Sequence, residues 1–149
     1  MTSPTLAVVD MQLDFSRTAS VCLHDVIREV EHAVQKNWGI VFLEYVNSGP
    51  TFKVLRSIVE NYNRVAFVPK TDDDGGYELI TAIKNRGFNP TDIRFCGVNR
   101  SACVISTIVG AGRAISNIGK PNFEIAINAT WCNSPDYGKE RLSHYGKFV

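Results

Sequence analysis

The sequence predicts an α/β fold, with a central parallel sheet of about five to six strands covered by helices. Short β-rich apolar runs alternate with helical patterns along all 149 residues, without repeats or low-complexity tracts. A chain of this length accommodates one sizeable core, so we expect a single domain over residues 1–149. In parallel sheets ligands bind outside the carboxyl ends of the strands, so chemistry is expected in residues that directly follow strands.

The expected strands share a short apolar run bounded by polar or turn-forming residues. They are Leu6–Val9, Ile40–Val46, Arg64–Val68, Asp92–Cys96 and Phe123–Ile127. The expected helices show apolar residues at three- and four-residue steps, and glycine follows two of them. They are Val21–Trp38 before Gly39, residues 51–61, Tyr77–Arg86 before Gly87, and a buried helix from Cys103 to Ala114. The polar and aromatic tail, residues 133–149, has weak helical character.

Composition argues against several classes of function. Lys and Arg number 16 against 15 Asp and Glu, and the basic residues are scattered, which gives no electrostatic case for nucleic acid or an anionic membrane. No apolar run is long enough to span a bilayer, and the first residues lack the basic region of a secretory signal. Four cysteines without metal or disulfide spacing indicate free thiols. We therefore expect a cytoplasmic protein without nucleic-acid or membrane partners.

Three residues that directly follow predicted strands are candidates for chemistry. Asp10 follows the first strand, Lys70 the third, and Cys103 begins the helix after the fourth. Each has an ordinary alternative, as a turn or capping aspartate, a solvated lysine and a small buried thiol respectively. Because parallel strands finish at one edge of the sheet, we expect the three side chains to converge there.

Together the three residue types fit an activated nucleophile. The unpaired N–H groups at a helix start should lower the pKa of the Cys103 thiol and raise its reactivity. Asp10 could accept the thiol proton, Lys70 could stabilise the charge, and backbone N–H groups could stabilise an oxyanion. The other cysteines and the three histidines, which are Cys22, Cys96, Cys132, His24, His32 and His144, are expected to be packing or surface residues.

These motifs resemble a known family. DMQLDF at 10–15, the lysine of VPK at 70, and GVNRSACVIST at 97–107 are similar to the isochorismatase-like cysteine hydrolases, which include nicotinamidases and N-carbamoylsarcosine amidohydrolases. The resemblance implies a three-layer α-β-α Rossmann-like fold and covalent catalysis through a thioester on a small-molecule substrate. It implies that Asp10 is the base, Lys70 the charge stabiliser and Cys103 the nucleophile.

The resemblance also implies finer features of the site and the assembly. A cis peptide is expected at Val98–Asn99, and the backbone N–H groups of Asn99 and Cys103 are expected to form the oxyanion hole. Phe15, Val98 and Asn99 are expected to contact substrate, with Phe15 as an apolar wall. A homo-oligomer is expected.

The sequence departs from the family where nicotinamidases bind metal. Those enzymes carry an Asp-x-His motif after the second strand, whereas this chain reads EYVNSGPTF without histidine. We therefore expect no metal and no cofactor. Arg100 also stands where many members have threonine.

Two functions follow as hypotheses. The first is a cysteine amidohydrolase that cleaves a C–N bond of a small amide or carbamoyl-type substrate. The second is a degenerate member that binds a small ligand or a partner without turnover, which the short loop after Val46 favours. Partner binding could use the tail aromatics Trp131, Tyr137, Tyr145 and Phe148. A nucleotide-binding domain is weakly supported, because the only G-x-G, at Gly110–Gly112, falls in a predicted helix.

Overall fold

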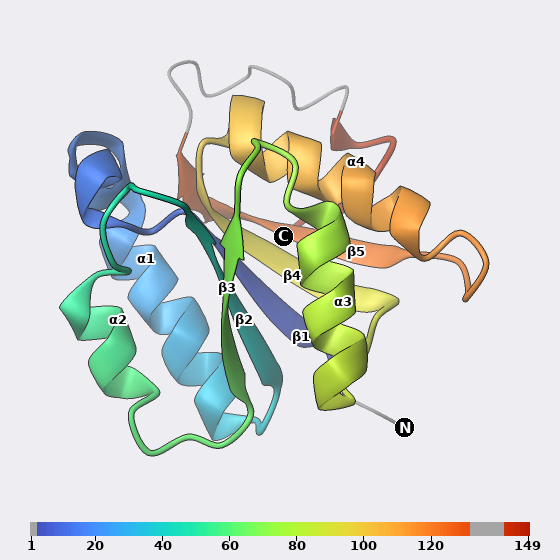
Figure 1. The fold of residues 1–149 in the computed structure, drawn as a ribbon, viewed down its shortest axis with the longest axis horizontal. Helices are drawn as coiled ribbons and strands as arrows, with labels where there is room; N and C mark the ends of the chain where they lie inside the picture. Colours follow the sequence, from blue (N-terminus) through green and yellow to red (C-terminus); the bar gives the residue numbers. More distant parts are fainter. Residues whose placement is uncertain (1–2, 132–141) are drawn as a thin grey trace.

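A computed structural model describes residues 3–131 and 142–149 of the chain. Figure 1 shows a sheet with helices on both of its faces, as the sequence predicts. The strands are β1 Thr5–Val9, β2 Gly39–Tyr45, β3 Val65–Lys70, β4 Asp92–Val98, β5 Asn122–Trp131 and β6 Lys147–Phe148. The helices are α1 Ser16–Gln35, α2 Lys53–Ile58, α3 Gly76–Arg86 and α4 Ile105–Ala114. A 3₁₀ turn at Leu13–Phe15 precedes α1, and a π-helical turn at Arg100–Val104 precedes α4.

The described sheet is parallel throughout, in the order β3-β2-β1-β4-β5-β6. The strand order reverses between β1 and β4, since β2 and β3 extend the sheet on one side and β5 and β6 on the other. This reversal is where an α/β sheet opens a crevice for ligands. Asp10 and the turn before Cys103 lie at the carboxyl ends of these two central strands.

Alternate residues of the central strands divide the core into two layers. On β1, Ala7 and Val9 pack in the layer that includes α3 and α4, whereas Leu6 and Val8 pack in the layer that includes α1 and α2. All four side chains are buried. Strands buried on both faces form near-continuous apolar runs, which explains why the motif LAVV predicts a strand without polar alternation.

The end of α1 differs from the prediction. The helix begins at Ser16 and ends at Gln35. Asn37, and not Gly39, takes the left-handed conformation (φ 60°) that follows the end of the helix. Asparagine tolerates this conformation better than most residues. Gly39 instead starts β2, where a side chain would overlap the ring of Phe88, since an added Cβ would lie 2.4 Å from it.

The six strands of the described sheet agree with the predicted five to six, but the first, third, fourth and fifth are longer than predicted, and the sixth lies in the tail, where weak helical character is expected. β5 runs to Trp131 because it carries a bulge, where the pairing with β4 shifts between Phe95 and Gly97. In the tail, Lys147 and Phe148 pair with β5 instead of forming a helix. A two-residue strand is too short to give a periodic pattern.

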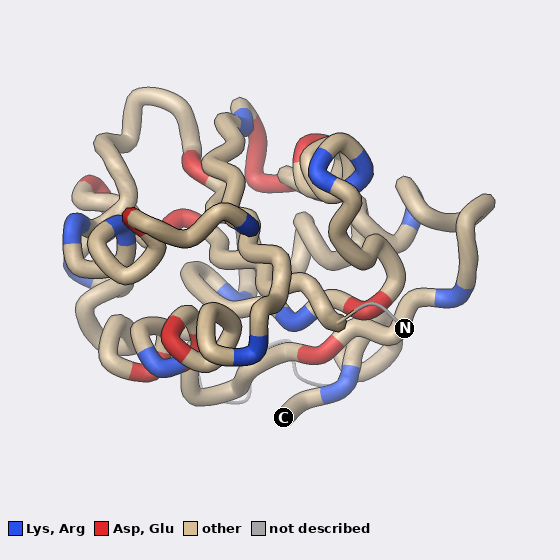
Figure 2. Tube along the Cα trace, turned by 90° about the horizontal axis from the view of Figure 1, so that it is seen from below, with Lys and Arg blue, Asp and Glu red and all other residues tan. Residues whose placement is uncertain are grey.

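Surface charge is mixed, as the sequence predicts. Figure 2 shows Lys and Arg interspersed with Asp and Glu along the trace. Over the described residues, no helix combines the length and the apolarity needed to cross a bilayer.

Two glycines, one in α3 and one in α4, allow a test of how closely these helices pack. Gly76 begins α3 against the backbone of α4, where an added Cβ would lie 2.2 Å from the amide nitrogen of Ala111. Gly112, also in a helix, has open space, with its nearest atom 4.0 Å from an added Cβ.

We expect the same substitution at these two positions to have opposite effects on stability. Gly76→Ala should lower the free energy of unfolding by about 1–3 kcal/mol through overpacking, whereas Gly112→Ala should raise it by about 0.5–1 kcal/mol through helix propensity. Urea denaturation of both variants checks this. A Gly76→Ala protein as stable as the unsubstituted protein would contradict the close α3–α4 packing.

Candidate active site

A buried ion pair forms the centre of the candidate site. The Nζ of Lys70 lies 3.3 Å from Oδ2 of Asp10, and both residues are 1% exposed. Asp10 follows β1 in a left-handed conformation (φ 54°), and its N–H donates to the carbonyl oxygen of Leu43 on β2. Burying two charges is expensive unless they are paired, so each side chain holds the other in place.

Lys70 reaches Asp10 from two strands away. The strand β2 lies between β3 and β1, so the long lysine side chain must cross the end of β2 to reach the edge where convergence is expected. It passes Gly75, where an added Cβ would lie 2.6 Å from its Cδ, and its Nζ lies 4.3 Å from the ring centroid of Tyr45. A cation over an aromatic face is stabilised by the ring quadrupole. A glycine and an aromatic residue therefore define the path of the lysine.

Cys103 joins this pair from the other side of the strand-order reversal. It lies in the π-helical turn after β4 and is 8% exposed. Its thiol interacts with the carboxylate of Asp10, and its Sγ also lies 3.5 Å from Oδ1 of Asp73. The three residues selected from the sequence therefore converge at the carboxyl edge of the sheet, and Asp73 is a fourth that the sequence reasoning did not select.

Burial dominates the electrostatics of the site. It raises the pKa of Asp10 above its ordinary value of 3.8, and the Cys103 thiol and Lys70 ammonium only partly offset this rise. It also raises the pKa of the Cys103 thiol, and the carboxylates of Asp10 and Asp73 raise it further. The prediction that the helix start lowers the thiol pKa is therefore wrong. Desolvation and two nearby negative charges outweigh the lysine, so the resting group is a thiol.

The turn that positions Cys103 has the expected backbone. The Val98–Asn99 peptide is cis, as predicted, and the carbonyl oxygen of Asn99 accepts hydrogen bonds from the N–H groups of Ala102 and Val104. Gly97 has φ 115°, and an added Cβ would lie 2.1 Å from the carbonyl oxygen of Val9. Only glycine fits this close approach of β4 to β1 at the start of the turn.

The expected substrate-contacting residues occupy different places. Val98 is 2% exposed and packs in the core layer with α1, so its side chain contacts protein. Phe15 is half-buried and packs edge-on against Tyr45, with ring centroids 6.4 Å apart. Asn99 has a buried Oδ1 without a hydrogen-bond partner among the described residues. Phe15 therefore packs against Tyr45, whose ring contacts the Lys70 ammonium. Among the described residues, the Oδ1 of Asn99 remains free to accept a hydrogen bond.

Arg100 is buried and ties this turn to β5. Its Nε donates to Oγ1 of Thr130 at 2.9 Å, and its Nη2 donates to the carbonyl oxygens of Ile127 and Thr130 at 3.0 and 3.3 Å. These acceptors lie in and after the β5 bulge. The arginine at this position thus braces the start of the Cys103 turn against the neighbouring strand.

Two further residues build the site and escaped the sequence reasoning. Gln12 is fully buried, and its side chain binds the loop after β2 through the backbone of Tyr45 and Gly49, at 2.7–2.9 Å. Asp73 lies in the loop after Lys70, whose Nζ donates to the carbonyl oxygens of Asp72 and Asp73 at 2.8 and 3.4 Å. The glutamine stands inside the DMQLDF motif, which was a usable signal, whereas a run of aspartates suggests only a solvated loop.

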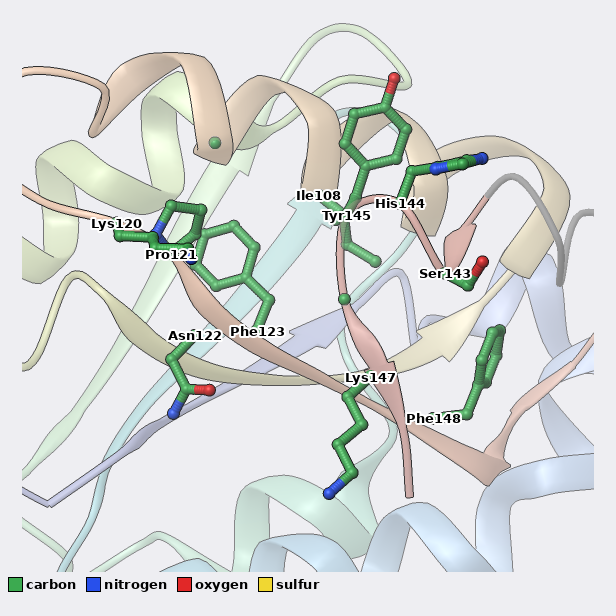
Figure 3. A pocket seen from close by; sticks show the side chains of 12 residues that line it. Ile108, Lys120, Pro121, Asn122, Phe123, Ser143, His144, Tyr145, Lys147 and Phe148 are labelled. Carbon is green, nitrogen blue, oxygen red and sulfur yellow. The ribbon is translucent and has the colours of Figure 1, made fainter.

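One hollow lined by described residues lies beside this site. It has about 300 Å³, flanks the Cys103 turn and is lined by Asp74, Ser101, Ile105, Ser106, Val109 and Arg113. A larger one of about 590 Å³ lies elsewhere, between α4, the start of β5 and the tail. Figure 3 shows that Lys147, which lines it, extends away from His144 and Tyr145, so these polar groups do not converge on one ligand position. Neither hollow is lined by a member of the Asp10, Lys70 and Cys103 trio.

The remaining sequence expectations concern residues outside the trio. His24, His32 and His144 are exposed, Cys22 and Cys96 are buried, and Gly110–Gly112 lie inside α4, as predicted. Of the tail aromatics, Trp131 and Phe148 pack against the core and Tyr145 is exposed. Tyr137 and Cys132 lie outside the described residues. Within residues 3–131 and 142–149, no three His, Cys, Asp or Glu side chains are grouped to hold a metal ion.

Comparison with known proteins places the fold. No family model matches the sequence, and no curated protein matches it. Among solved structures, a nicotinamidase from Staphylococcus aureus superposes with a TM-score of 0.80 at 18% identity, covering 99% of each chain. An N-carbamoylsarcosine amidase from Thermoplasma acidophilum gives 0.79 at 14% identity, covering 99% of this chain and 95% of its own. The chain has the isochorismatase-like hydrolase fold.

This fold does not by itself determine the chemistry. A MAR1 ribonuclease from Caenorhabditis elegans matches with a TM-score of 0.81 at 15% identity, covering 99% of this chain and 76% of its own. One fold commonly hosts different functions, so function must be argued from the site. In this chain, that site is the trio and its surroundings.

The buried pair makes a test of the geometry. Lys70→Met should lower the free energy of unfolding by about 3–5 kcal/mol, because it leaves the Asp10 carboxyl buried without its cation. The double variant Asp10→Asn/Lys70→Met should cost less than the sum of the two single variants, because neither charge is then left alone. Urea denaturation of all four proteins measures this coupling. Strictly additive costs would contradict a direct interaction between the two side chains.

Proposed function

We propose that this protein is a cysteine amidohydrolase that cleaves a C–N bond of a small amide or carbamoyl-type substrate through a covalent thioester. The observation that carries the proposal is the buried contact of a thiol, a carboxylate and an ammonium group at the strand-order reversal. The fold shared with a nicotinamidase and an N-carbamoylsarcosine amidase supports it. The proposal requires no metal or cofactor, and it retains the expected cytoplasmic location and homo-oligomeric state.

The residues suggest a two-step reaction. In the first, the Cys103 Sγ attacks the carbonyl carbon while Asp10 accepts the thiol proton. Asp10 then delivers that proton to the departing nitrogen, the C–N bond breaks, and a thioester and an amine or ammonia result. In the second, Asp10 accepts a proton from water, the resulting hydroxide attacks the thioester, and the carboxylic acid leaves as Cys103 recovers its proton.

The raised pKa values suit this sequence of proton transfers. A carboxylate whose pKa is raised is a stronger base than an ordinary aspartate, and the resting thiol keeps its proton until substrate arrives. Lys70 would stabilise the negative charge that passes between Asp10, Cys103 and the substrate oxygen. In the proposal, the backbone N–H groups of Asn99 and Cys103 receive the oxyanion.

A screen of small amides that measures ammonia release tests the activity. Cys103→Ala should abolish turnover, because it removes the nucleophile, and Cys22→Ala is the matched control, since Cys22 is also a buried thiol but lies on α1. Treatment with a chelator should leave turnover unchanged, because the loop after β2 lacks the histidine of a metal motif. Full activity in Cys103→Ala would exclude thioester chemistry.

The pH dependence follows from Asp10. Its base form is the carboxylate, which exists only above its raised pKa, so kcat/KM should fall as pH decreases through a value above 3.8. The Asp73 carboxylate contributes to the raised pKa of Asp10, so Asp73→Asn should move this acid limb to lower pH. Profiles of kcat/KM against pH for both proteins measure the shift. An acid limb that moves to higher pH in Asp73→Asn would contradict the assignment of Asp10 as the base.

The second candidate is a binding protein without turnover. It is favoured by the burial of the trio, whose members are 1–8% exposed, and by the hollow that flanks the Cys103 turn without being lined by any of the three. On this alternative, Asp10 and Lys70 stabilise the fold and Cys103 is a packed thiol. The ammonia-release screen separates the two, since only the hydrolase releases ammonia in a Cys103-dependent way.

A further inference from the structure

The candidate site has more hydrogen-bond acceptors than donors. The Oδ1 of Asn99 is buried without a hydrogen-bond partner among the described residues, and the buried carboxylate of Asp10 contacts only the Lys70 ammonium and the Cys103 thiol as donors there. The ammonium of Lys70 is within 3.3 Å of Asp10 but directs its hydrogen bonds to the carbonyl oxygens of Asp72 and Asp73. Unpartnered buried acceptors are costly, so a ligand that supplies donors would relieve that cost.

Asp73 adds an accessible negative charge at the nucleophile. Asp73 is exposed, yet its Oδ1 lies 3.5 Å from the Sγ of Cys103, so the carboxylate faces both the solvent and the thiol. Asp10 and Asp73 carry two negative charges against the one positive charge of Lys70, and the neighbouring Asp72 is also exposed. The approach to the thiol is therefore negatively charged.

We propose that Asp73 selects amide substrates that carry a cationic group, such as a protonated amine or a guanidinium, close to the scissile carbonyl, and disfavours anionic amides. The inference rests on the proposed hydrolase function and specifies its substrate class. Asp73 is then a specificity residue that binds the cation, while Asp10 remains the base.

The distances set where the cation must be. A carbonyl carbon poised for attack lies about 3–3.5 Å from the sulfur, and Asp73 lies at a similar distance from the sulfur. A cation two or three bonds from the carbonyl carbon could therefore contact the Asp73 carboxylate. The reaction is an ordinary hydrolysis, in which amide and water give carboxylic acid and amine, and the cationic group is unchanged.

The charge preference can be measured without relying on turnover. Three methanethiosulfonates differ chiefly in charge: the 2-aminoethyl (cationic), methyl (neutral) and 2-sulfonatoethyl (anionic) reagents. Each forms a mixed disulfide as the thiolate displaces methanesulfinate, and peptide mass spectrometry follows modification at Cys103, with Cys103→Ala as the background. The ratio of the cationic to the anionic rate cancels changes in the thiolate fraction, because those affect all three reagents equally.

We expect the unsubstituted protein to favour the cationic reagent, and Asp73→Asn to lower the rate ratio by about tenfold, because an exposed charge attracts the cation and repels the anion only weakly in water and the ratio combines the two effects. Asp72→Asn removes the same charge from the same loop and should lower the ratio less. A ratio unchanged by Asp73→Asn, or lowered equally by Asp72→Asn, would overturn the role of Asp73. A thiol that none of the three reagents reaches would also overturn it, since the reagents are comparable in size to the proposed amides.

Hydrolysis of β-alaninamide, butyramide and succinamate then separates this inference from the proposed function. We expect β-alaninamide to be preferred over succinamate, and this preference to fall about tenfold in Asp73→Asn with the unfolding temperature unchanged, since Asp73 is an exposed charge. Turnover that favours succinamate would overturn the inference and leave the hydrolase intact. Absence of Cys103-dependent turnover with every amide screened, while the labelling ratio still depends on Asp73, would overturn the hydrolase and support a binder of cations.

Discussion

The ion pair of Asp10 and Lys70 is the constraint around which the site is built. Two charges that are 1% exposed must be held together, and they come from strands that are not neighbours. Gly75 provides the space that the lysine side chain needs, and the ring of Tyr45 covers its ammonium. The side chain of Gln12 binds the backbone of Tyr45 and so holds the end of β2 in place. The residues around the trio thus hold the Lys70 side chain in contact with Asp10.

The same burial determines the protonation state of Cys103. A thiol beside two carboxylates in a desolvated site is a weak acid at rest, so in the proposed mechanism its reactivity depends on passing its proton to Asp10. This differs from cysteines that a helix start and nearby cations keep as thiolates. A protein with such a resting thiol would be less exposed to random alkylation and oxidation.

The sequence was sufficient for the parallel sheet and for the convergence of the trio, because apolar runs identify strands and parallel strands end at one edge. It was insufficient where tertiary contacts decide where an element ends or whether a short strand forms. Asn37 rather than Gly39 ends α1, and β6 is too short to show a pattern. Desolvation is a property of the folded site, so neither the raised thiol pKa nor the contact of Asp73 with Cys103 could be inferred from a run of aspartates.

The position of Lys70 at the end of β3 also bears on how the protein can assemble. It ends β3, the edge strand of the described sheet on the β2 side, and Pro69 precedes it. An edge strand presents unpaired backbone groups on which another chain could dock, and a proline removes one N–H from that strand. Self-association through continuation of the sheet at β3 is therefore disfavoured. An assembly of this protein that leaves the lysine undisturbed would form through surfaces other than the β3 edge.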